Sequence, residues 1–540
     1  FYQSSDQHVG NFNNVIIAEN SVVGSTSHND GGGGMWIANS YDLNLVNVTV
    51  VNNSAGQSNG GGIWRAAGVI DIVNSIIWFN AAAGDSSIND HSELIITYSD
   101  IEGGYEGENN INAHPLFCNA DSSDFTLYNT SPCLGTGQDG GNMGALGIGC
   151  YEDYAGPTWY VSVDGNDEAN GAIQSPFSTI QHGINIAMDG HTISVAEGTY
   201  YENINFGGKN ISVMGANMDS TIIDGNQNGT VVTIPSLSDS TALLKNFTIQ
   251  NGNAINNGVA GGIDITSSDI RLKNVIVKDN NSTNNVGGIS IAGYSPALDS
   301  VYVENNVGNN GGGIFINGNP TITNSIIRNN QAGNGAGVRI DVDSSPILEN
   351  VIIRNNYASD QGGGIYSNGW GNPTFINVLV DSNQCQWSGG GIYLDVMVGV
   401  TLSGITINNN VAINGDGGGL YLFDGGYTLN EMTVQNNTAT GSGGGISCRS
   451  SNTTINNSRI IGNVCVSGEE NLGGGLFFDE PDHLFINNTL FANNQSGDQG
   501  GAIGFNGGGG QDQSLINVTL YGNIAETGSS IYLDANSDLV

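Results

Sequence analysis

The sequence predicts an all-β protein in which parallel strands wind into a β-helix solenoid. Asparagine occurs in pairs on either side of a short apolar strand, and from Asn280 to Asn523 the second asparagine returns every 24 to 30 residues. A run of glycines precedes another apolar-x-apolar strand with the same period. Alternation with period two indicates strands, and a fixed period of this length indicates one supersecondary unit per coil.

The asparagine pairs are expected to mark one corner of every coil. Asparagines at equivalent corners can hydrogen-bond to each other in the coils above and below, which satisfies the backbone amides of the turn. The pairs are Asn14/Asn20, Asn47/Asn53, Asn74/Asn80, Asn274/Asn280, Asn324/Asn330, Asn350/Asn356, Asn377/Asn383, Asn457/Asn463, Asn487/Asn493 and Asn517/Asn523.

The glycine runs are expected to form a second corner, because glycine adopts positive φ and lets two backbones approach closely. The strand after each run begins with an apolar residue that should point into the core. The residues expected to stack inward are Ile314, Val338, Ile365, Ile392, Leu420 and Ile446.

Two β-helices in tandem are expected, because the repeat is interrupted between about residues 84 and 209. Residues 1–153 are predicted to be the C-terminal part of a first β-helix with a loop-rich closing segment. Cys118, Cys133 and Cys150 cluster in that segment, where we expect a Cys133–Cys150 disulfide. Because both ends of the chain break the repeat, we expect it to be an excerpt of a longer protein.

Residues 157–540 are predicted to be the second β-helix, with an N-terminal cap at 157–209 and about a dozen coils, truncated at the C-terminus. Residues 176–188 have helical spacing, with Ser175 as the expected N-cap and Pro176 at the first helical position. A short helix at this place would cover the open end of the solenoid, which otherwise exposes strand edges.

The charge balance excludes several kinds of partner. The chain has 11 Lys and Arg against 50 Asp and Glu, a net charge of −39. This balance argues against nucleic acid or an anionic membrane as a partner. No apolar run reaches the roughly 18 residues that a membrane-spanning helix needs, so we expect no membrane span in this segment.

Three segments of the second β-helix have a distinctive sequence: residues 160–167 (YVSVDGND), 175–188 (SPFSTIQHGINIAM) and 198–202 (GTYYE). They resemble the N-terminal cap and first coils of secreted right-handed parallel β-helix proteins of the pectin-lyase-like superfamily. Residues 95–117 (IITYSDIEGGYEGENNINAHPLF) resemble the closing segment of such domains in bacterial surface proteins. The glycine- and asparagine-rich repeats are also similar to those of chlamydial polymorphic outer-membrane adhesins. The resemblance implies a right-handed coil and an extracellular or cell-surface location in a bacterium, with export and anchoring signals outside this segment.

The superfamily includes enzymes, but their motifs are incomplete here. The GTYYE segment is similar to the GxYxE motif of pectin methylesterases, whose later motifs do not follow. A calcium-dependent lyase needs clustered carboxylates and a nearby base. The best such group is Arg339, Asp341 and Asp395, and Asp341, Asp343 and Asp395 are the candidate calcium ligands. The alternative is a solvated strand face with local ion pairs.

An aromatic row is the other candidate site. The outward position after the glycines carries Phe315, Tyr366, Tyr393, Tyr421 and Phe477, and two residues further on lie Asn368 and Asp395. Aromatic faces beside carboxylates and amides suit sugar rings, whereas stacking that stiffens the sheet is the alternative. A second outward row, Lys278, Glu304, Arg328, Arg354 and Asp381, is interpreted as a mixed-charge ladder.

Three functions follow from these features. The favoured one is a non-catalytic surface protein, a rigid stalk or adhesin that binds polysaccharide, cell-surface glycans or sister subunits. The second is a calcium-dependent polysaccharide lyase or a glycoside hydrolase, with calcium as the only cofactor considered. The third is a purely structural fibre subunit.

Overall fold

The chain forms two compact units, a first unit of Phe1–Tyr154 and a second unit of Ala155–Val540. The computed structural model describes residues 9–23, 32–37, 42–56, 60–82, 87–90, 94–150, 154–236, 241–254, 259–466, 472–479, 483–507 and 513–534. The division between the units falls between residues 153 and 157, and residue 153 itself lies outside the described residues. Most of the strands pair in parallel, which confirms the all-β parallel β-helix.

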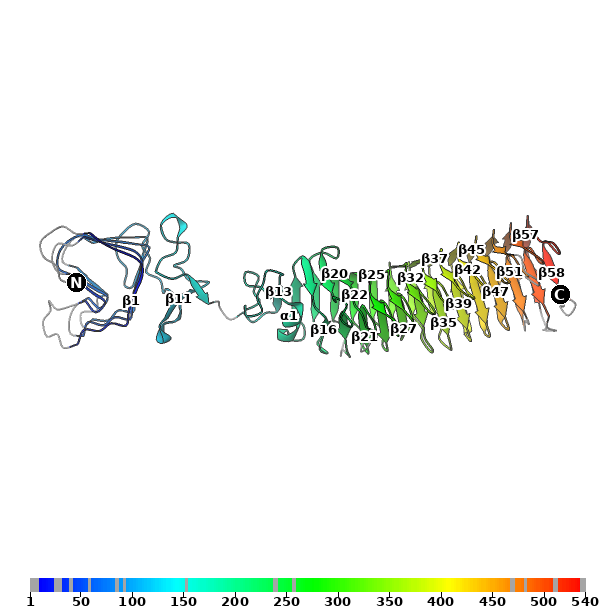
Figure 1. Ribbon diagram of the computed structural model, residues 1–540, viewed down its shortest axis with the longest axis horizontal. Coiled ribbons are helices and arrows are strands. Elements are labelled where there is room, and N and C mark those ends of the chain that lie inside the picture. The colour runs from blue at the N-terminus through cyan, green and yellow to red at the C-terminus, as the bar shows by residue number, and fades with distance from the viewer. Residues whose placement is uncertain are drawn as a thin grey trace. The chain divides into compact units, whose positions relative to one another are not determined.

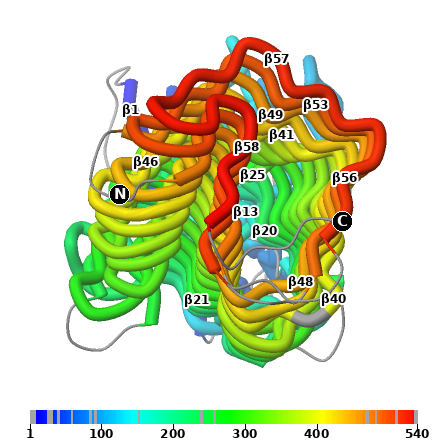
Figure 2. The backbone as a smooth tube through the Cα atoms, turned by 90° about the vertical axis from the view of Figure 1, so that its right-hand side faces the viewer, coloured from blue at the N-terminus to red at the C-terminus, as the bar shows by residue number. Residues whose placement is uncertain are grey.

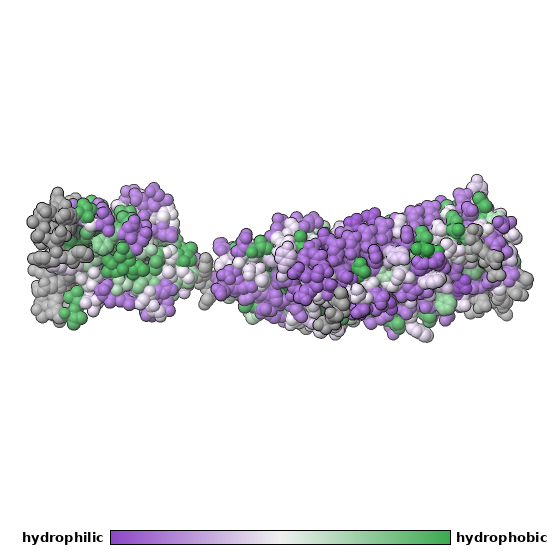
Figure 3. All heavy atoms as spheres, in the orientation of Figure 1, coloured by the Kyte–Doolittle hydropathy of each residue, from purple (hydrophilic) through white to green (hydrophobic). Residues whose placement is uncertain are grey.

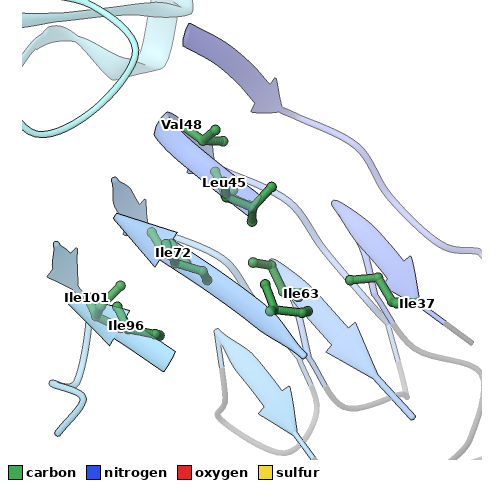
Figure 4. Packing of buried hydrophobic residues seen from close by; sticks show 10 residues of the cluster. Ile37, Leu45, Val48, Ile63, Ile72, Ile96 and Ile101 are labelled. Atoms are coloured by element: carbon green, nitrogen blue, oxygen red, sulfur yellow. The ribbon is translucent and has the colours of Figure 1, made fainter. Parts of the chain in front are cut away.

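The first unit contains a parallel sheet of long strands and a sheet of short glycine-led strands. Their inward side chains, among them Leu45, Ile63, Ile72 and Ile96, form one apolar core (Figure 4). The first sheet consists of β1 (Val9–Ala18), β3 (Asp42–Val51), β5 (Ile70–Val73), β6 (Ile76–Trp78), β8 (Leu94–Thr97) and β9 (Asp100–Ile101). The second consists of β2 (Met35–Ile37), β4 (Ile63–Arg65) and β7 (Ile88–Asp90).

The closing segment of the first unit is a small sheet of β10 (Phe117–Asn119), β11 (Asp124–Tyr128) and β12 (Ile148–Cys150). The predicted Cys133–Cys150 disulfide is wrong, because Cys150 is bonded to Cys118. Cys118 on β10 and Cys150 on β12 belong to strands that both pair with β11, and their Cα atoms are 5.8 Å apart. Cys133 is instead a buried free thiol.

Cys133 lies against a buried carboxylate. Its Sγ donates to Oδ2 of Asp100 at 3.1 Å, and the backbone N–H of Ala113 donates to Oδ1 at 3.1 Å. Asp100 has no exposed surface. Burial is the main reason that the pKa of Asp100 rises to about 6.

The second unit is a stack of coils whose strands form two continuous parallel sheets (Figures 1 and 2). We call them the long sheet, which begins at β13 (Thr158–Val161), and the glycine-led sheet, which begins at β16 (Ile204–Asn205). Two smaller sheets complete the coil: a short-strand sheet from β23 (Asn281–Ser282) to β54 (Gln495–Ser496), and a side sheet from β40 (Val398–Ser403) to β56 (Gln513–Ile516).

The glycine-led sheet carries the candidate site. After β16 its strands are β19 (Val232–Ile234), β21 (Ile263–Thr266), β24 (Ile289–Ala292), β27 (Ile314–Asn317), β31 (Val338–Ile340), β35 (Ile365–Asn368), β39 (Ile392–Asp395), β43 (Leu420–Phe423), β47 (Ile446–Arg449), β51 (Leu476–Asp479), β55 (Ile503–Asn506) and β58 (Ile531–Leu533). The residues predicted to stack inward are buried and pair in register from coil to coil.

The long sheet lies on another side of the coil. After β13 its strands are β14 (Thr192–Val195), β15 (Gly198–Tyr201), β17 (Ser212–Gly215), β18 (Thr221–Asp224), β20 (Leu243–Gln250), β22 (Arg271–Lys278), β25 (Ala297–Glu304), β28 (Thr321–Thr323), β29 (Ile326–Arg328), β32 (Ile347–Glu349), β33 (Ile352–Arg354), β36 (Thr374–Ile376), β37 (Leu379–Asp381), β41 (Thr406–Asn408), β45 (Thr433–Gln435), β49 (Arg459–Ile461), β53 (Leu490–Ala492) and β57 (Thr519–Tyr521).

The asparagine ladder is present as predicted. Asn383 shows how each member is used: Nδ2 donates to Asn410 Oδ1 at 3.0 Å and to Ile353 O at 2.9 Å, while Oδ1 accepts from the backbone and side chain of Asn356. The members in the second unit are Asn280, Asn306, Asn330, Asn356, Asn383, Asn410, Asn437, Asn463, Asn494 and Asn523. The pair predicted at Asn487 and Asn493 lies one residue later, since Asn494 occupies the ladder and Asn488 has the positive φ.

The glycine corner fits against this ladder. Gly389, the first glycine of one run, has φ +73°, which side chains rarely tolerate. A Cβ on Gly391 would lie 3.0 Å from Nδ2 of Asn410. The glycine run and the asparagine ladder therefore require each other, which explains their common period.

The predicted helix is shorter than expected. α1 spans Ile180–Ile186, with Thr179 rather than Ser175 as N-cap, and Thr179 Oγ1 accepts from His182 N at 3.2 Å. Pro176 precedes Phe177, whose N–H donates to Tyr160 O at 2.9 Å, so this stretch is extended beside β13 instead of helical.

Candidate functional site on the glycine-led sheet

The predicted aromatic row lies on the outer face of the glycine-led sheet. Alternation along each strand turns the second residue outward, and parallel pairing brings these residues into register. The row runs through Asp264, Ser290, Phe315, Arg339, Tyr366, Tyr393, Tyr421, Ser447 and Phe477.

The three tyrosines of the row stack on one another. The ring centroids of Tyr366 and Tyr393 are 5.2 Å apart with an interplanar angle of 13°, and those of Tyr393 and Tyr421 are 5.0 Å apart at 10°. The tyrosines are only 7–9% exposed, and Phe477 is 2% exposed. The expectation of an open aromatic platform is wrong, because the ring faces are already occupied by neighbouring rings.

The tyrosine hydroxyls are the polar part of this stack. Burial is the largest cause that raises the pKa of all three, with the pKa of Tyr421 reaching about 12. The hydroxyls therefore stay protonated at neutral pH and can donate a hydrogen bond.

Two arginines bracket the tyrosine stack. The guanidinium of Arg339 lies 6.0 Å from the Phe315 ring centroid and 5.5 Å from that of Tyr366, and Nη1 donates to Asn310 Oδ1 at 3.1 Å. These are cation–π contacts, in which the guanidinium carries its usual positive charge. The charged form has no lone pair with which to accept a proton, which is unfavourable for the general-base role considered for Arg339.

Arg449 closes the other end of the stack. It lies 5.4 Å from the Phe477 ring centroid and forms ion pairs of 2.9 Å with both Asp416 and Asp479. Asp416 and Asn310 come from the loops that lead from the short-strand sheet into the glycine runs. These loops therefore supply polar side chains to the same face.

The second outward row contains the other predicted residues. Asn368 and Asp395 are direct register partners, whereas Asp341 lies one coil before Asn368 and accepts a 3.4 Å bond from Asn317. Two coil spacings, roughly 10 Å, therefore separate Asp341 from Asp395. Asp343 is exposed in the turn after β31 with φ +63°.

The predicted acidic residues do not form a metal-binding group. Among the residues that the structure describes, no set of three or more His, Cys, Asp or Glu side chains is placed to hold a metal ion. Arg339, Asp341 and Asp395 likewise form no hydrogen bond or ion pair with one another in the described part of the chain. Burial is the first cause that raises the pKa of Asp395, and the carboxylate of Asp424 adds to it.

Buried polar atoms without a hydrogen-bond partner in the described structure gather along this face. They belong to Asp264, Ser290, Arg339, Asn368, Asp395, Ser447 and Arg449, which we call the polar strip. Asp264 and Ser290 form no well-aligned hydrogen bond, but they lie close enough that the Ser290 hydroxyl opposes the rise in the pKa of Asp264 that burial causes. Buried polar groups in proteins are almost always bonded, so a row of exceptions requires an explanation. At about 4.8 Å per coil, the strip from β21 to β47 is roughly 34 Å long.

Sequence reasoning did not include Asp264 and Ser290, and it treated Ser447 only as an interruption of the aromatic row. Their signal is present in the sequence, since each follows the first apolar residue after a glycine run. Emphasis on aromatic side chains concealed that the same outward positions also carry polar residues, some of whose buried atoms have no hydrogen-bond partner in the described structure.

The GTYYE segment has a structural role in this chain. Glu202 accepts from the backbone N–H groups of Ile180 and Gln181 at 2.8 and 2.9 Å, at the N-terminus of α1. Tyr200 donates its hydroxyl to Ala196 O at 3.0 Å. Lys209 donates to three carbonyls at the other end of the helix, those of Ile184, Asn185 and Ala187. Both ends of α1 are thus fixed to the first coils.

A family model described as right handed beta helix region matches residues 302–464, which confirms the predicted resemblance for this part of the chain. No curated protein matches the sequence. No helix among the described residues is both long and apolar enough to cross a membrane.

Several solved structures have a similar fold. A complex of XylC with xylose is 13% identical over 70% of this chain and 86% of its own, with a TM-score of 0.39. The A-module of the mannuronan C-5 epimerase AlgE6 from Azotobacter vinelandii is 14% identical over 65% and 90%, with a TM-score of 0.33. Pectate lyase Pel9A is 15% identical over 61% and 76%, with a TM-score of 0.26. At these identities the similarity concerns the fold only.

Proposed function

We propose that this chain is a non-catalytic, extracellular carbohydrate-binding protein whose second unit holds a saccharide chain along the polar strip. The observation that carries the proposal is the adjacent pair of buried, unbonded acceptors, Asn368 Oδ1 and Asp395 Oδ1. Both side chains are half-buried, and a small turn of each would bring its unbonded oxygen to a sugar hydroxyl. Because a buried acceptor without a partner is costly, a hydroxyl donor there would be favourable.

The geometry suits a long, repetitive ligand. Equivalent positions return once per coil, at about the length of one sugar unit, and the tyrosine hydroxyls supply donors beside the acceptors. The stack of rings and the asparagine ladder hold these groups in fixed positions, which lowers the entropy lost on binding. Binding at each coil is weak, and avidity along the strip raises the total affinity.

The enzyme alternative has less support. A lyase needs a base beside the sugar, and Arg339 is held between two aromatic rings in its charged form. The raised pKa of Asp395 is the one property that favours a catalytic acid. A fibre subunit remains the third proposal, with the same face as a contact between subunits.

The test is a glycan array probed with the intact chain, with calcium and with a chelator. We expect binding to a set of polysaccharides, and loss of binding in the Asn368→Ala/Asp395→Ala variant. Asn506→Ala is the matched control, because Asn506 is an exposed residue of the same row outside the polar strip. Loss of binding in the chelator would assign calcium a bridging role at Asp395.

Two outcomes would contradict the proposal. One is the absence of binding to any glycan, which would favour the fibre subunit. The other is release of unsaturated or shortened sugars from a bound polymer, which would make the chain an enzyme and direct attention to Asp395.

A further inference from the structure

The short-strand sheet of the second unit carries an outward row of side chains. In Figure 2 this sheet is marked by β46 (Thr438–Ala439). In each of its two-residue strands the first side chain is exposed or half-buried, and the second is buried. The first residues therefore form one row on the outer surface, in which parallel pairing places each residue beside its equivalent in the next coil.

We call this row the alternating row, because apolar and polar members take turns along it without exception from Asn281 to Ile524. The apolar members are Val307, Tyr357, Val411, Val464 and Ile524. The polar members are Asn281, Gln331, Gln384, Thr438 and Gln495. None of these side chains is charged, although the chain has 50 acidic residues.

Stability of the coil does not explain the alternation. Equal residues in successive coils stabilise a solenoid by stacking or by hydrogen bonds, as the asparagine ladder and the tyrosine stack do. Gln384 instead has Tyr357 and Val411 as its register neighbours, so no ladder of amides forms in this row. Its side chain is exposed and has no hydrogen-bond partner in the described structure. These unused groups indicate a partner outside the chain.

The middle of the alternating row has the composition of an interface core. Tyr357 is 37% exposed, the neighbouring Trp387 is 51% exposed, and Val411 and Ile413 are half-buried. Tryptophan and tyrosine are enriched in interface cores, from which charged residues are depleted. In the view of Figure 3, hydrophilic side chains predominate on the second unit, and single apolar ones are scattered among them. An exposed apolar group on such a surface marks a contact with another protein.

Two-fold symmetry makes the alternating row complementary to itself. An axis that passes through one member, perpendicular to the row, reverses the order of the coils in a second copy and brings the two rows face to face. Because the row alternates strictly, every apolar member then faces an apolar member, and every polar member faces a polar one. With the axis at Val411, which faces itself, the pairs are Val307 with Ile524, Gln331 with Gln495, Tyr357 with Val464, and Gln384 with Thr438.

The apolar members favour Val411 as the position of the axis. An axis at Val411 covers every apolar member of the row, whereas an axis at Gln384 leaves Ile524 uncovered, and Ile524 is 60% exposed. Ile413, two residues further along the chain than Val411, then also lies at the centre of the contact. Association is driven by the apolar area removed from water, so the arrangement that covers more of it is preferred.

From this complementarity we infer that the alternating row binds a second copy of this chain, in an antiparallel pair with its two-fold axis at Val411. The facing surface from Val307 to Ile524 is roughly 38 Å long and, with the adjoining loops, roughly 15–20 Å wide. This gives about 600–750 Å² per copy, slightly less than the roughly 800 Å² of a standard interface. The inference does not depend on the polar strip, because the two surfaces belong to different sheets.

The test is sedimentation velocity of the intact chain over a range of about 1–100 μM. We expect a weak dimer whose dissociation constant falls about ten-fold or more between about 0.05 M and 0.5 M salt. The reason is that each copy has a net charge of −39, and salt screens the repulsion between the two copies. A contact held by ion pairs would weaken with salt instead, and that result would overturn the inference.

Two charged variants locate the contact. Val411→Asp places two carboxylates at the axis and should abolish the dimer. The matched control is Ile347→Asp, which adds the same charge at an exposed residue of the long sheet and should leave the dimer unchanged. Both variants should unfold at the same temperature as the wild type, because both side chains point outward. A dimer that survives Val411→Asp would overturn the inference.

Single cysteines test the position and direction of the axis. On mild oxidation with copper, Val411→Cys should form a disulfide with its own counterpart in the second copy. Tyr357→Cys should form one only when it is combined with Val464→Cys, and the free cysteines of the wild type are buried. Self-cross-linking of Gln384→Cys or of Tyr357→Cys alone would overturn the antiparallel axis at Val411. A chain that stays monomeric at every salt concentration would overturn the whole inference.

Discussion

At the scale of single residues, the asparagine ladder shows how one type of side chain satisfies the buried hydrogen-bond donors and acceptors at one corner of every coil. Asn383 and Asn410 have no exposed surface, and each donates and accepts in two directions. The amide is small, carries both donor and acceptor, and fits beside a glycine backbone. No other uncharged side chain of this size combines a carbonyl acceptor with an N–H donor.

Replacement of Asn383 by Leu should therefore destabilise the second unit. Leu leaves the carbonyl of Ile353 and the amides of Asn356 without their partners, and each unsatisfied buried group costs about 1–3 kcal/mol. We expect a loss of about 3 kcal/mol or more in the free energy of unfolding, measured by urea denaturation. The exposed Asn414 provides the control, because Asn414→Leu should change stability by less than about 0.5 kcal/mol. Equal free energies of unfolding for the two variants would show that the ladder hydrogen bonds do not stabilise the second unit.

Asp100 should make the stability of the first unit depend on pH. Its pKa is about 6 in the folded state and near 3.8 in the unfolded chain, so the folded state binds the proton more tightly. This stabilisation is complete below about pH 4 and is lost as the pH rises through about 6, by no more than about 3 kcal/mol.

The Asp100→Asn variant tests this dependence, because Asn keeps an acceptor for Ala113 N but does not titrate. The unfolding temperature of the first unit should fall between pH 4 and pH 7 in the wild type and should stay constant in the variant. A parallel fall in both proteins would assign the dependence to other groups.

At the scale of strands and rows, the outer face of the glycine-led sheet is a rigid stack of aromatic rings. Tyr393 is enclosed by Tyr366 and Tyr421, whose ring centroids are 5.2 and 5.0 Å away. The row was expected to present ring faces to a ligand, but adjacent coils are so close that neighbouring rings stack on each other. The ligand is therefore proposed to meet hydroxyl groups and side-chain oxygens rather than ring faces.

The stack predicts different effects on stability for removal of the Tyr393 ring and for removal of its hydroxyl group alone. Tyr393→Ala removes a buried ring and should lower the free energy of unfolding by about 3–5 kcal/mol. Tyr393→Phe keeps the ring and removes only the hydroxyl, so stability should change by less than about 1 kcal/mol. Denaturant unfolding of both variants measures this difference, and similar stability of the Ala variant and the wild type would contradict the buried stack.

The repeat could be read from the sequence because each coil repeats the same two constraints. Gly391 must be small beside Asn410, and Asn410 must be an amide, so both positions recur with the coil period. The inward row that includes Ile365 and Ile392 followed from strand alternation alone.

The exposure of the outward rows could not be predicted in the same way. Whether Tyr421 is open or buried depends partly on loop side chains such as that of Asp416, which lies near enough to influence the pKa of Tyr421, and loop paths have no period. The helix start shifted from Ser175 to Thr179 for a similar reason: the carboxylate of Asp167, distant in sequence, binds the N–H groups of Ser178 and Thr179 and fixes the cap. The disulfide was predicted with the wrong partner because the approach of Cys118 to Cys150 depends on strand pairing in an irregular segment.

At the scale of the whole second unit, two outer faces carry polar rows of different composition. The polar strip contains carboxylates, amides, hydroxyls and two arginines, whereas the outer face of the long sheet carries, within β20, β22, β29 and β33, six of the 11 Lys and Arg residues beside Asp299, Glu304, Glu349 and Asp381. A rigid solenoid keeps such rows straight over many coils, since each coil contacts only its neighbours.

The most direct test of the account is the affinity of an array-selected oligosaccharide, measured by calorimetry. We compare the wild type, the Asn368→Ala/Asp395→Ala variant and the Asn506→Ala control, all at neutral pH and with matched unfolding temperatures. Loss of two buried acceptors should reduce affinity about ten-fold or more, whereas the control should bind like the wild type. Equal affinity of all three proteins would show that the saccharide does not lie on the polar strip and would contradict the central claim.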